Sequence, residues 1–387
     1  SRGLGDVYKR QLFVGSLVAV LVMCLLPNAG SFGMAVSTAM IFGLVSLMFL
    51  DTSINMAMQP FKMMVGDMVN EKQKGLAYSI QSFLCNAGSL VGFLFPFIFT
   101  WIGISNIAPQ GVVPDSVIYS FYIGAAILIL CVIYTTVKVK EMPPAEYAEY
   151  HGITEEEKKE KINMVKLLVK APKAFWTVGL VQFFCWFAFM FMWTYTNGSV
   201  AANVFDAPTV ETVVNGASKI VLDTKSIQYQ NAADWVGVLF AVQAIGSVLW
   251  AVCIPMFKNR KLIYSLSLVL GGIGFISTYF VHNQYVLFIS FLLIGCAWAA
   301  MLALPFTILT NALSGGHMGT YLGLFNGTIC IPQIVAATLG GSILALFTPK
   351  GMLPPEINML VMAGVMLIIG AVCVYLIKET KGEQAKA

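Results

Sequence analysis

The chain has 387 residues, of which 58% are hydrophobic and only 11% are charged, and its mean hydropathy is +0.79. This composition excludes an ordinary soluble domain and predicts a polytopic membrane protein. The formal net charge is only +4. Most basic residues flank apolar stretches, which argues against a surface that binds nucleic acid.

Ten apolar stretches follow one another along the chain, each close to the ~17–25 residues that a helix needs to cross a bilayer. They are Leu12–Leu26, Gly33–Pro60, Leu76–Trp101, Val117–Val137, Phe175–Tyr195, Trp235–Phe257, Leu262–Val281, Tyr285–Leu309, Tyr321–Leu346 and Met359–Ile377. All eight cysteines fall inside these stretches, away from loops in which an oxidising compartment would pair them. The sequence therefore predicts an all-α polytopic membrane protein with free thiols.

The distribution of basic residues predicts the orientation in the membrane. Of the 23 Lys and Arg residues, only Lys219, Lys225 and Lys350 fall on one side of the predicted spans, and the other 20 fall on the opposite side. Basic flanks stay in the cytoplasm. We therefore predict an integral protein of the bacterial inner membrane, with both termini and the loop 138–174 in the cytoplasm.

The chain repeats itself weakly at a distance of about 245–250 residues, as the halves of some transporters do. Arg10-Gln-Leu-Phe-Val resembles Arg260-Lys-Leu-Ile-Tyr, and Met58-Gln-Pro-Phe resembles Ala303-Leu-Pro-Phe, with Gly75 and Gly319 following at similar distances. The repeat pairs the first span with the seventh and the second with the eighth. The repeating unit is therefore six helices, and we expect ten of twelve helices here, with two missing from the front.

The domain boundaries follow from this repeat. We expect residues 1–11 to be a leader without native structure, 12–137 a partial N-terminal half of four helices, and 175–378 a C-terminal half of six helices. Residues 138–174 form a cytoplasmic linker, and 379–387 form a cytoplasmic tail. In the linker, Thr154-Glu-Glu-Glu reads as a capping box that opens a short basic amphipathic helix to about Val169. This helix reads either as a linker lying against the inner leaflet or as a regulatory module.

Several kinds of chemistry have no residues to support them. The three histidines, His151, His282 and His317, fall in loops or at span edges, so no histidine cage for a metal lies within the membrane. The sequence has no P-loop pattern and no nucleophile beside a base. We therefore expect no enzyme activity, no cofactor and no metal.

Asp51 is a lone carboxylate inside a long apolar run. Placing an ionisable side chain in lipid costs at least about 2.5–3.5 kcal/mol, so such a residue usually faces a cavity and handles a proton or an ion. On a helix, Asn55 and Lys62 share the face of Asp51. We predict that Asp51 couples proton movement to transport. The alternatives are that Asp51 is a structural hydrogen-bond acceptor, and that Lys62 reaches the inner headgroups instead of pairing with Asp51.

The helix around Asp51 resembles the plant sucrose–proton symporters and their bacterial and animal relatives in the major facilitator superfamily. The matching positions are Leu50, Asp51, Asn55, Pro60, Lys62 (Arg in the family) and Asp67. Two later helices also match, at Gly88 and Gly92 and at Gly319, Leu322, Gly323, Asn326, Pro332 and Gln333, and the internal repeat adds Pro305 opposite Pro60. The resemblance implies a two-half helix bundle, and we expect these prolines, glycines and polar residues to have structural or gating roles.

One region departs from the family. Where the plant proteins carry acidic residues and an Arg-Glu pair, this chain has Thr196, Gly198, Ala202 and Asn203. The charge network of the second half is therefore missing, and sucrose specificity does not carry over from the resemblance.

Amides and aromatics within the spans are candidates for contact with a sugar, because amides pair with hydroxyls and aromatic faces cover the apolar face of the ring. The candidates are Asn55, Gln81, Asn86, Gln182, Trp186, Gln243, Trp298 and Asn326. We predict a monomeric carrier that imports a glucoside or a disaccharide, such as maltose or sucrose, with protons. The alternatives are a sodium-coupled or uncoupled sugar carrier, an efflux carrier for apolar compounds, and a sugar sensor that does not transport.

Overall fold

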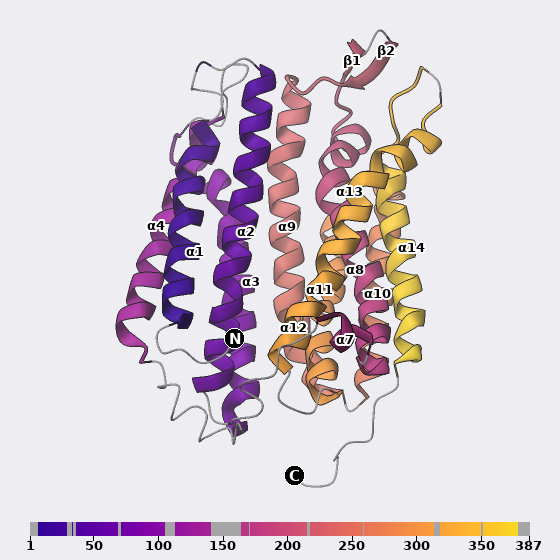
Figure 1. Cartoon of the computed structure of the whole chain (residues 1–387). Helices are drawn as coiled ribbons and strands as arrows, with labels where there is room; N and C mark the ends of the chain where they lie inside the picture. The colour runs from indigo at the N-terminus through magenta and orange to yellow at the C-terminus, as the bar shows by residue number, and fades with distance from the viewer. Residues whose placement is uncertain are drawn as a thin grey trace. The chain divides into compact units, whose positions relative to one another are not determined.

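The structure is a computed structural model, and it describes residues 7–28, 33, 36–68, 71–104, 113–140, 164–169, 171–214, 217–257, 259–312, 318–349 and 351–377. The chain divides into two compact units, Ser1–Lys161 (unit 1) and Ile162–Ala387 (unit 2). Each unit is described by itself below. Figure 1 shows that both are built of long helices.

Unit 1 contains four long helices: α1 (Val7–Leu25), α2 (Val36–Met68), α3 (Glu71–Trp101) and α4 (Asp115–Lys138). Helix α1 packs against α2 and α4, and α3 packs against α4. Gly15 allows α1 to approach α2 closely, because a Cβ there would lie 3.1 Å from the Ser53 carbonyl oxygen. The buried core of the described part is small and centres on Leu12, Ala57 and Val132.

Unit 2 contains the helices α7 (Met164–Val169), α8 (Lys173–Asn203), α9 (Ile227–Cys253), α10 (Arg260–Ser277), α11 (Leu287–Ala312), α12 (Met318–Phe325), α13 (Gly327–Phe347) and α14 (Ile357–Cys373), and short 3₁₀ turns at Ile254–Met256 and Val374–Leu376. Helix α8 packs against α9, α11, α13 and α14, and α10 packs against α11 and α14. Side chains cap two of these helices, since Ser226 accepts from the Tyr229 amide and Asn259 accepts from the Leu262 amide. The main core lies here, around α8.

Glycines bring the backbones of α10, α11 and α14 close together. A Cβ at Gly272 would lie 2.9 Å from the carbonyl oxygen of Gly364, and one at Gly274 would lie 2.6 Å from that of Ser290. A Cβ at Gly271 would overlap Ala297. Small residues that allow such approach are typical of helix contacts in membranes. Gly271, Gly272 and Gly274 are therefore packing residues of unit 2.

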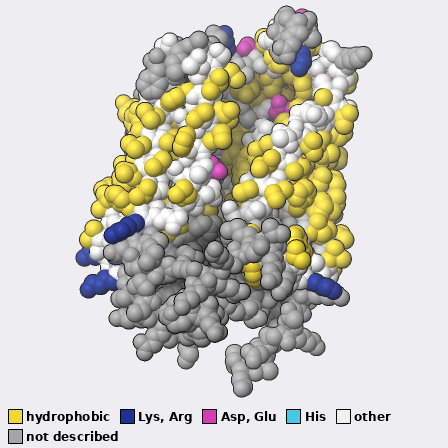
Figure 2. Space-filling model, in the orientation of Figure 1, with side chains coloured by type: hydrophobic (Ala, Val, Ile, Leu, Met, Phe, Trp, Pro, Cys, Tyr) yellow, Lys and Arg dark blue, Asp and Glu magenta, His cyan; other side chains and the backbone are white. Residues whose placement is uncertain are grey.

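The predicted spans agree with the helices. In the described part of the chain, nine helices are long and apolar enough to cross a membrane. They match nine of the ten predicted stretches. The tenth, Leu76–Trp101, is helical within α3, where the described apolar segment Phe83–Phe95 is shorter. Figure 2 shows hydrophobic side chains over the sides of the helices, with Lys and Arg side chains toward their ends. All eight cysteines are free, as predicted.

The helix packing repeats between the units. Helix α1 packs on α2 and α4 as α10 packs on α11 and α14, and both α2 and α11 contain an interior proline, Pro60 and Pro305. These pairs correspond to those in the sequence repeat, in which the first span matches the seventh and the second matches the eighth. The same arrangement is thus built twice, as expected for a two-half bundle.

Three details differ from the sequence expectations. Helix α1 begins at Val7 rather than near Leu12. The all-α expectation missed an antiparallel hairpin of β1 (Thr209–Val214) and β2 (Ala217–Leu222), which follows α8 (Figure 1). The predicted amphipathic helix lies outside the described residues except for its last part, which is α7. We call the end of unit 2 that carries β1 and β2 the hairpin end.

Candidate functional site

Helix α8 is the central helix of unit 2, and its side chains are largely buried. It begins after Pro172, whose fixed φ suits the position before a helix. It is apolar on every side, as expected for a helix that neighbours surround. Two candidates from the sequence, Gln182 and Trp186, lie one turn apart on it, and their exposed fractions are 0% and 8%.

Gln182 completes the backbone hydrogen bonding of α11. The carbonyl of Met301 would normally accept from the amide of residue 305, but Pro305 has no N–H. The Nε2 of Gln182 donates to that carbonyl oxygen instead, at 3.3 Å. A buried carbonyl without a partner costs about 1–3 kcal/mol. Gln182 therefore stabilises the crossing of α8 with the proline-containing part of α11.

An aromatic cluster surrounds the next turn of α8. The indole ring of Trp298 on α11 lies 5.8 Å from Trp186, 5.8 Å from Trp193 and 4.9 Å from Phe189, measured between ring centroids. The two tryptophan pairs with Trp298 meet edge to face, which is a favoured geometry for aromatic rings. The structure thus brings together the predicted residues Trp186 and Trp298 and adds Trp193, which is 40% exposed.

Two polar atoms beside this cluster have no partner. The Oε1 of Gln182 and the Nε1 of Trp186 are buried and make no hydrogen bond within the described part of the chain. One is an acceptor and the other is a donor. A hydroxyl group can donate to the first and accept from the second. We call Gln182, Trp186, Trp193 and Trp298 the α8/α11 site.

The other polar candidates of unit 2 are Gln243 and Asn326. Gln243 is 5% exposed on α9, beside the close crossing where a Cβ at Gly295 of α11 would meet the Gln243 carbonyl oxygen. No hydrogen bond or ring contact among the described residues joins Gln243 to the α8/α11 site. Asn326 is half-buried between α12 and α13, and its Nδ2 lies 3.9 Å from the Sγ of Cys330.

The motif residues near the end of the chain have mixed environments. Pro305 in α11 and Pro332 in α13 are buried inside their helices, and Gln333 is half-buried. Gly323 is exposed, with nothing within 4 Å of a Cβ there. Gly319 belongs to α12, but its surroundings lie outside the description. Gly323 therefore makes no close helix contact among the described residues.

In unit 1 the predicted coupling residue is on the surface. Asp51 is exposed on α2 and lies outside the small core of the unit. Asn55 shares its face, as predicted, but the Asn55 Nδ2 donates to the Asp51 backbone carbonyl oxygen at 2.9 Å. Pro60 is buried in the same helix. The side chains of Lys62 and Asp67 lie outside the described part, and so does the interpretation that pairs Lys62 with Asp51.

The remaining candidates of unit 1 lie on α3. Asn86 is 6% exposed and Gln81 is half-buried. Gly88 and Gly92 are exposed, and nothing described lies within 4 Å of a Cβ at either position. Gly75 belongs to α3, although its surroundings are outside the description. The described part therefore shows no tight packing at Gly88 or Gly92.

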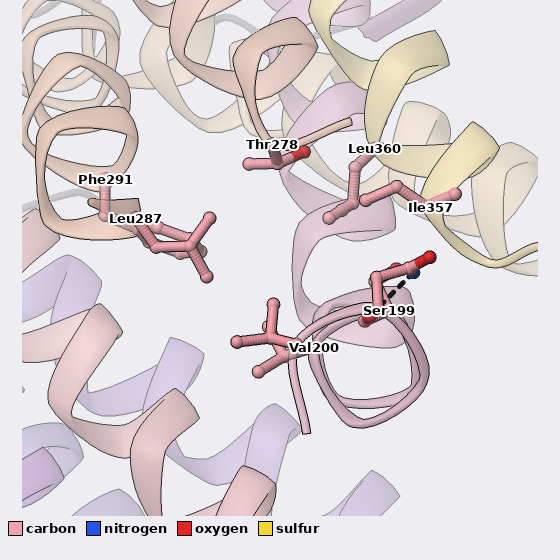
Figure 3. A pocket seen from close by; sticks show the side chains of 9 residues that line it. Ser199, Val200, Thr278, Leu287, Phe291, Ile357 and Leu360 are labelled. Atoms are coloured by element: carbon pink, nitrogen blue, oxygen red, sulfur yellow. Dashed lines mark hydrogen bonds between the residues drawn. The ribbon is translucent and has the colours of Figure 1, made fainter. Parts of the chain in front are cut away.

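A small cavity lies at the hairpin end of unit 2 (Figure 3). It is lined by Ser199, Val200, Asn203, Val204, Thr278, Leu287, Phe291, Ile357 and Leu360. The Ser199 carbonyl oxygen is already bonded to Asn203 Nδ2 at 2.8 Å. The cavity volume is about 10 Å³, roughly enough for one water molecule. The cavity is too small to hold a sugar.

Sequence reasoning missed one ionisable group of unit 2. Glu356 directly precedes α14 and the span Ile357–Leu376. Its carboxylate rests on α8 at Gly198, where a Cβ would overlap it. Burial raises the pKa of this carboxyl group from 4.5 to about 7. The only signal in the sequence was an acid, Glu356, beside an apolar span. Gly198, the small residue that it meets, is far away in the chain.

Comparisons with known proteins agree with this architecture. A family profile described as Major Facilitator Superfamily matches residues 3–221 and 200–387. No curated protein sequence matches the chain significantly. The family match covers both units and therefore most of the chain.

Solved structures share the fold at low sequence identity. A D-xylose-proton symporter is similar with a TM-score of 0.67 and 14% identity over 97% of this chain and 82% of that one. A Major Facilitator Superfamily transporter, FucP, in its outward conformation is similar with a TM-score of 0.60 and 12% identity over 95% of this chain and 83% of that one. A bacterial homologue of the human lysosomal transporter Spinster is similar with a TM-score of 0.56 and 15% identity over 97% of this chain and 82% of that one.

At such identities the structural likeness shows the fold, while the profile match shows the family. The nine apolar helices of the described residues, and the packing that repeats between the units, agree with that family. The chain is therefore an integral membrane transporter that belongs to the Major Facilitator Superfamily.

Proposed function

We propose that this chain carries a sugar across the membrane by alternating access, with substrate contacts at the α8/α11 site and proton coupling through Asp51. The observation that carries the proposal is a pair of buried atoms, Gln182 Oε1 and Trp186 Nε1, that have no partner among the described residues and belong to a cluster with Trp193 and Trp298. Sugars offer both hydroxyl groups and an apolar ring face. A site for them combines a few polar atoms with aromatic surface.

The α8/α11 site is closed in this conformation. Gln182 is 0% exposed and Trp186 is 8% exposed, so a substrate reaches them only after α8 and α11 shift. Pro305 lies in α11 beside this contact, and a proline lets a helix bend because one backbone bond is already absent. Alternating access requires such a change between closed and open states. The half-exposed ring of Trp193 marks the side from which a sugar would enter.

Asp51 supplies the coupling group of the proposal. It is a carboxylate on an apolar helix, exposed on the surface of unit 1. A carboxyl group that alternates between charged and neutral can link a proton to each transport cycle. One of the similar solved structures is a D-xylose-proton symporter. That likeness supports sugar as the substrate class and the proton as the coupling ion, and we retain a glucoside or disaccharide as the specific substrate.

Uptake into proteoliposomes tests the proposal. The chain is reconstituted and supplied with labelled xylose, fucose, maltose and sucrose, with and without an inward proton gradient. We expect accumulation of at least one sugar only when the gradient is present. Accumulation driven by a sodium gradient alone would show that the coupling ion is sodium and not the proton. Failure to bind or move any sugar would overturn the proposal.

An efflux carrier for apolar compounds is the second candidate, because the α8/α11 site is rich in aromatic surface. Trp186, Trp193 and Trp298 would stack on a flat apolar compound as readily as on a sugar. The same vesicles, loaded with an aromatic cation, distinguish the two functions. Competition between the cation and a sugar for one site would favour a broad specificity, whereas transport of the cation alone would favour efflux.

We also propose that both termini face the cytoplasm. Successive helices run in opposite directions, so alternate helix ends lie on the same side of each unit. One side carries the described basic residues Lys9, Arg10, Lys138 and Arg260. Lys219 lies in the hairpin at the other end of unit 2. A cysteine introduced at Lys219 should react with an impermeant thiol reagent in intact cells. A cysteine at Lys138 should react only after the cells are opened, and reaction from outside would reverse the orientation.

A further inference from the structure

Glu356 occupies a position on α8 that only a glycine leaves open. Its carboxylate lies against Gly198, and a Cβ at Gly198 would overlap both the carboxylate carbon and an oxygen. Gly198 is itself buried in α8. The start of α14 is therefore held to the hairpin end of α8 through the carboxylate of Glu356, and the two helices pack against one another along their length.

Neutral polar groups surround this carboxylate. The titratable groups that face it are the phenols of Tyr195 on α8 and Tyr229 on α9, and both interact with its charge. Helix α13 contributes Gly340, which packs against the hydroxyl of Tyr195. Asn197 donates its Nδ2 to the Tyr229 hydroxyl at 2.9 Å. No described residue forms an ion pair with Glu356.

Asn197 supplies a second and independent observation. Its Oδ1 is buried and has no hydrogen-bond partner in the described part of the chain. Asn197 directly precedes Gly198, on which the Glu356 carboxylate rests, and it is bonded to Tyr229, which interacts with that carboxylate. A protonated carboxyl group has an O–H donor, whereas an ionised one has only acceptors. The surroundings therefore favour the protonated form of Glu356.

We propose that Glu356 is a proton-binding site of unit 2, and that its protonated side chain holds the start of α14 against Gly198 of α8. Deprotonation leaves an ionised carboxylate among neutral groups, so the side chain moves toward water and the contact loosens at the hairpin end. This site is separate from Asp51 and from the α8/α11 site. It does not depend on which substrate the protein carries.

The pH range follows from the burial of the group. Burial raises the pKa of Glu356 to about 7 from its ordinary 4.5. The folded state therefore binds this proton more tightly than the unfolded state does. The proton on Glu356 therefore stabilises the folded state fully at a pH below the ordinary pKa of 4.5, and this stabilisation is lost as the pH rises through about 7.

Thermal unfolding of the full chain in detergent tests the proposal. Between about pH 5 and pH 8, deprotonation of Glu356 should lower the melting temperature of the parent. In Glu356→Gln, which cannot lose this proton, the melting temperature should fall less over the same pH range. Glu211→Gln, at an exposed carboxylate of β1, is the matched control and should keep the parental slope. A Glu356→Gln profile that follows the parent at every pH would overturn the proposal.

Infrared spectroscopy provides a second measurement that does not require Glu356→Gln to fold. The carbonyl band of a protonated carboxyl group should disappear with a midpoint near pH 7 in the parent. Gly198→Ala should displace the carboxylate into water and move this midpoint toward the ordinary 4.5. Gly341→Ala, where nothing lies within 4 Å of the new Cβ, should leave it unchanged. A parental midpoint already at the ordinary value would rule out the site.

Discussion

Asp51 in unit 1 and Cys296 in unit 2 hold matching places in a repeated framework. Each lies nine residues before the interior proline of its helix, Pro60 in α2 and Pro305 in α11. Asp51 is exposed, whereas Cys296 is 8% exposed and its Sγ lies 3.6 Å from the Leu292 carbonyl oxygen of its own helix. The same helix type thus presents a charge in one unit and packs an apolar side chain in the other.

The described buried core is also smaller in unit 1 than in unit 2. The described core of unit 1 is limited to a few residues around Leu12, Ala57 and Val132, whereas the core of unit 2 extends over α8, α10, α11 and α14. On α8 of unit 2, the buried polar side chains of the α8/α11 site, Gln182 and Trp186, are neutral. Under the proposed function, the coupling charge lies on unit 1 and the neutral substrate contacts lie in unit 2.

The largest effect should come from Asp51→Asn, which removes the protonatable group. In proteoliposomes with a proton gradient, the accumulation ratio should fall to about one, because uncoupled transport only equalises concentrations. Sugar exchange between equal concentrations should persist. Cys296→Ser, at the matching position of unit 2, should accumulate sugar as the parent does.

Two results would break the comparison between the units. One is accumulation by Asp51→Asn against a gradient. The other is loss of coupling in Cys296→Ser, which would show that the matching position of unit 2 is also part of the coupling machinery.

The next largest effect concerns the packing of unit 2. Gln182→Leu removes the donor to the Met301 carbonyl and should lower the free energy of unfolding by about 1–3 kcal/mol. In the Pro305→Ala background an amide can serve that carbonyl from within α11. The cost of Gln182→Leu should therefore be clearly smaller there. Unfolding of the four proteins in detergent completes the double-mutant cycle.

An equal cost of Gln182→Leu in both backgrounds would show that the Met301 carbonyl is not what Gln182 stabilises. Gln230→Leu is the matched control, since its amide donates to the Thr224 carbonyl oxygen at the exposed start of α9. It should cost less than Gln182→Leu and should cost the same in both backgrounds.

The smallest effect should distinguish two tryptophans of unit 2. Trp186 Nε1 has no partner in the described part, whereas Trp250 Nε1 donates to the Ser267 hydroxyl at 2.8 Å. Trp186→Phe should therefore lower stability less than Trp250→Phe, which also loses a hydrogen bond, and should weaken sugar binding about threefold to tenfold, the value of one neutral hydrogen bond. Trp250→Phe should lower stability and leave binding unchanged. Fluorescence titration and thermal unfolding measure both, and the reverse pattern would remove Trp186 from the substrate site.

The sequence predicted the helices well because span length and hydropathy are local properties. It also paired α2 with α11 correctly through Pro60 and Pro305. The hairpin was missed although Asn215-Gly216 stands between two alternating segments, Thr209–Val214 and Ala217–Leu222, which is a strong hairpin signal. Span length and hydropathy, which predict the helices, do not indicate short strands in a loop.

The site was harder to predict because its contacts join residues that are far apart in the chain. Composition placed Gln182, Trp186 and Trp298 among eight candidates, but only packing shows that Trp186 meets Trp298 and that Gln182 binds the same helix, α11. The hydrogen bond from Gln182 to the Met301 carbonyl, which Pro305 leaves without its usual donor, joins residues 119 positions apart, and no local pattern encodes it. Glu356 escaped notice because an acid at a span edge ordinarily faces water.

The close glycine contacts of unit 2 also bear on how its gene can vary. Every single-nucleotide change that replaces a glycine codon with another amino acid adds a side chain. At Gly272, Gly274 and Gly364 the added Cβ would lie under 3.0 Å from a backbone oxygen, which flexible side chains cannot relieve. Directed evolution that starts from this chain should therefore fix few substitutions at these three positions and find freer variation at Gly43, Gly92 and Gly323, where the space is open.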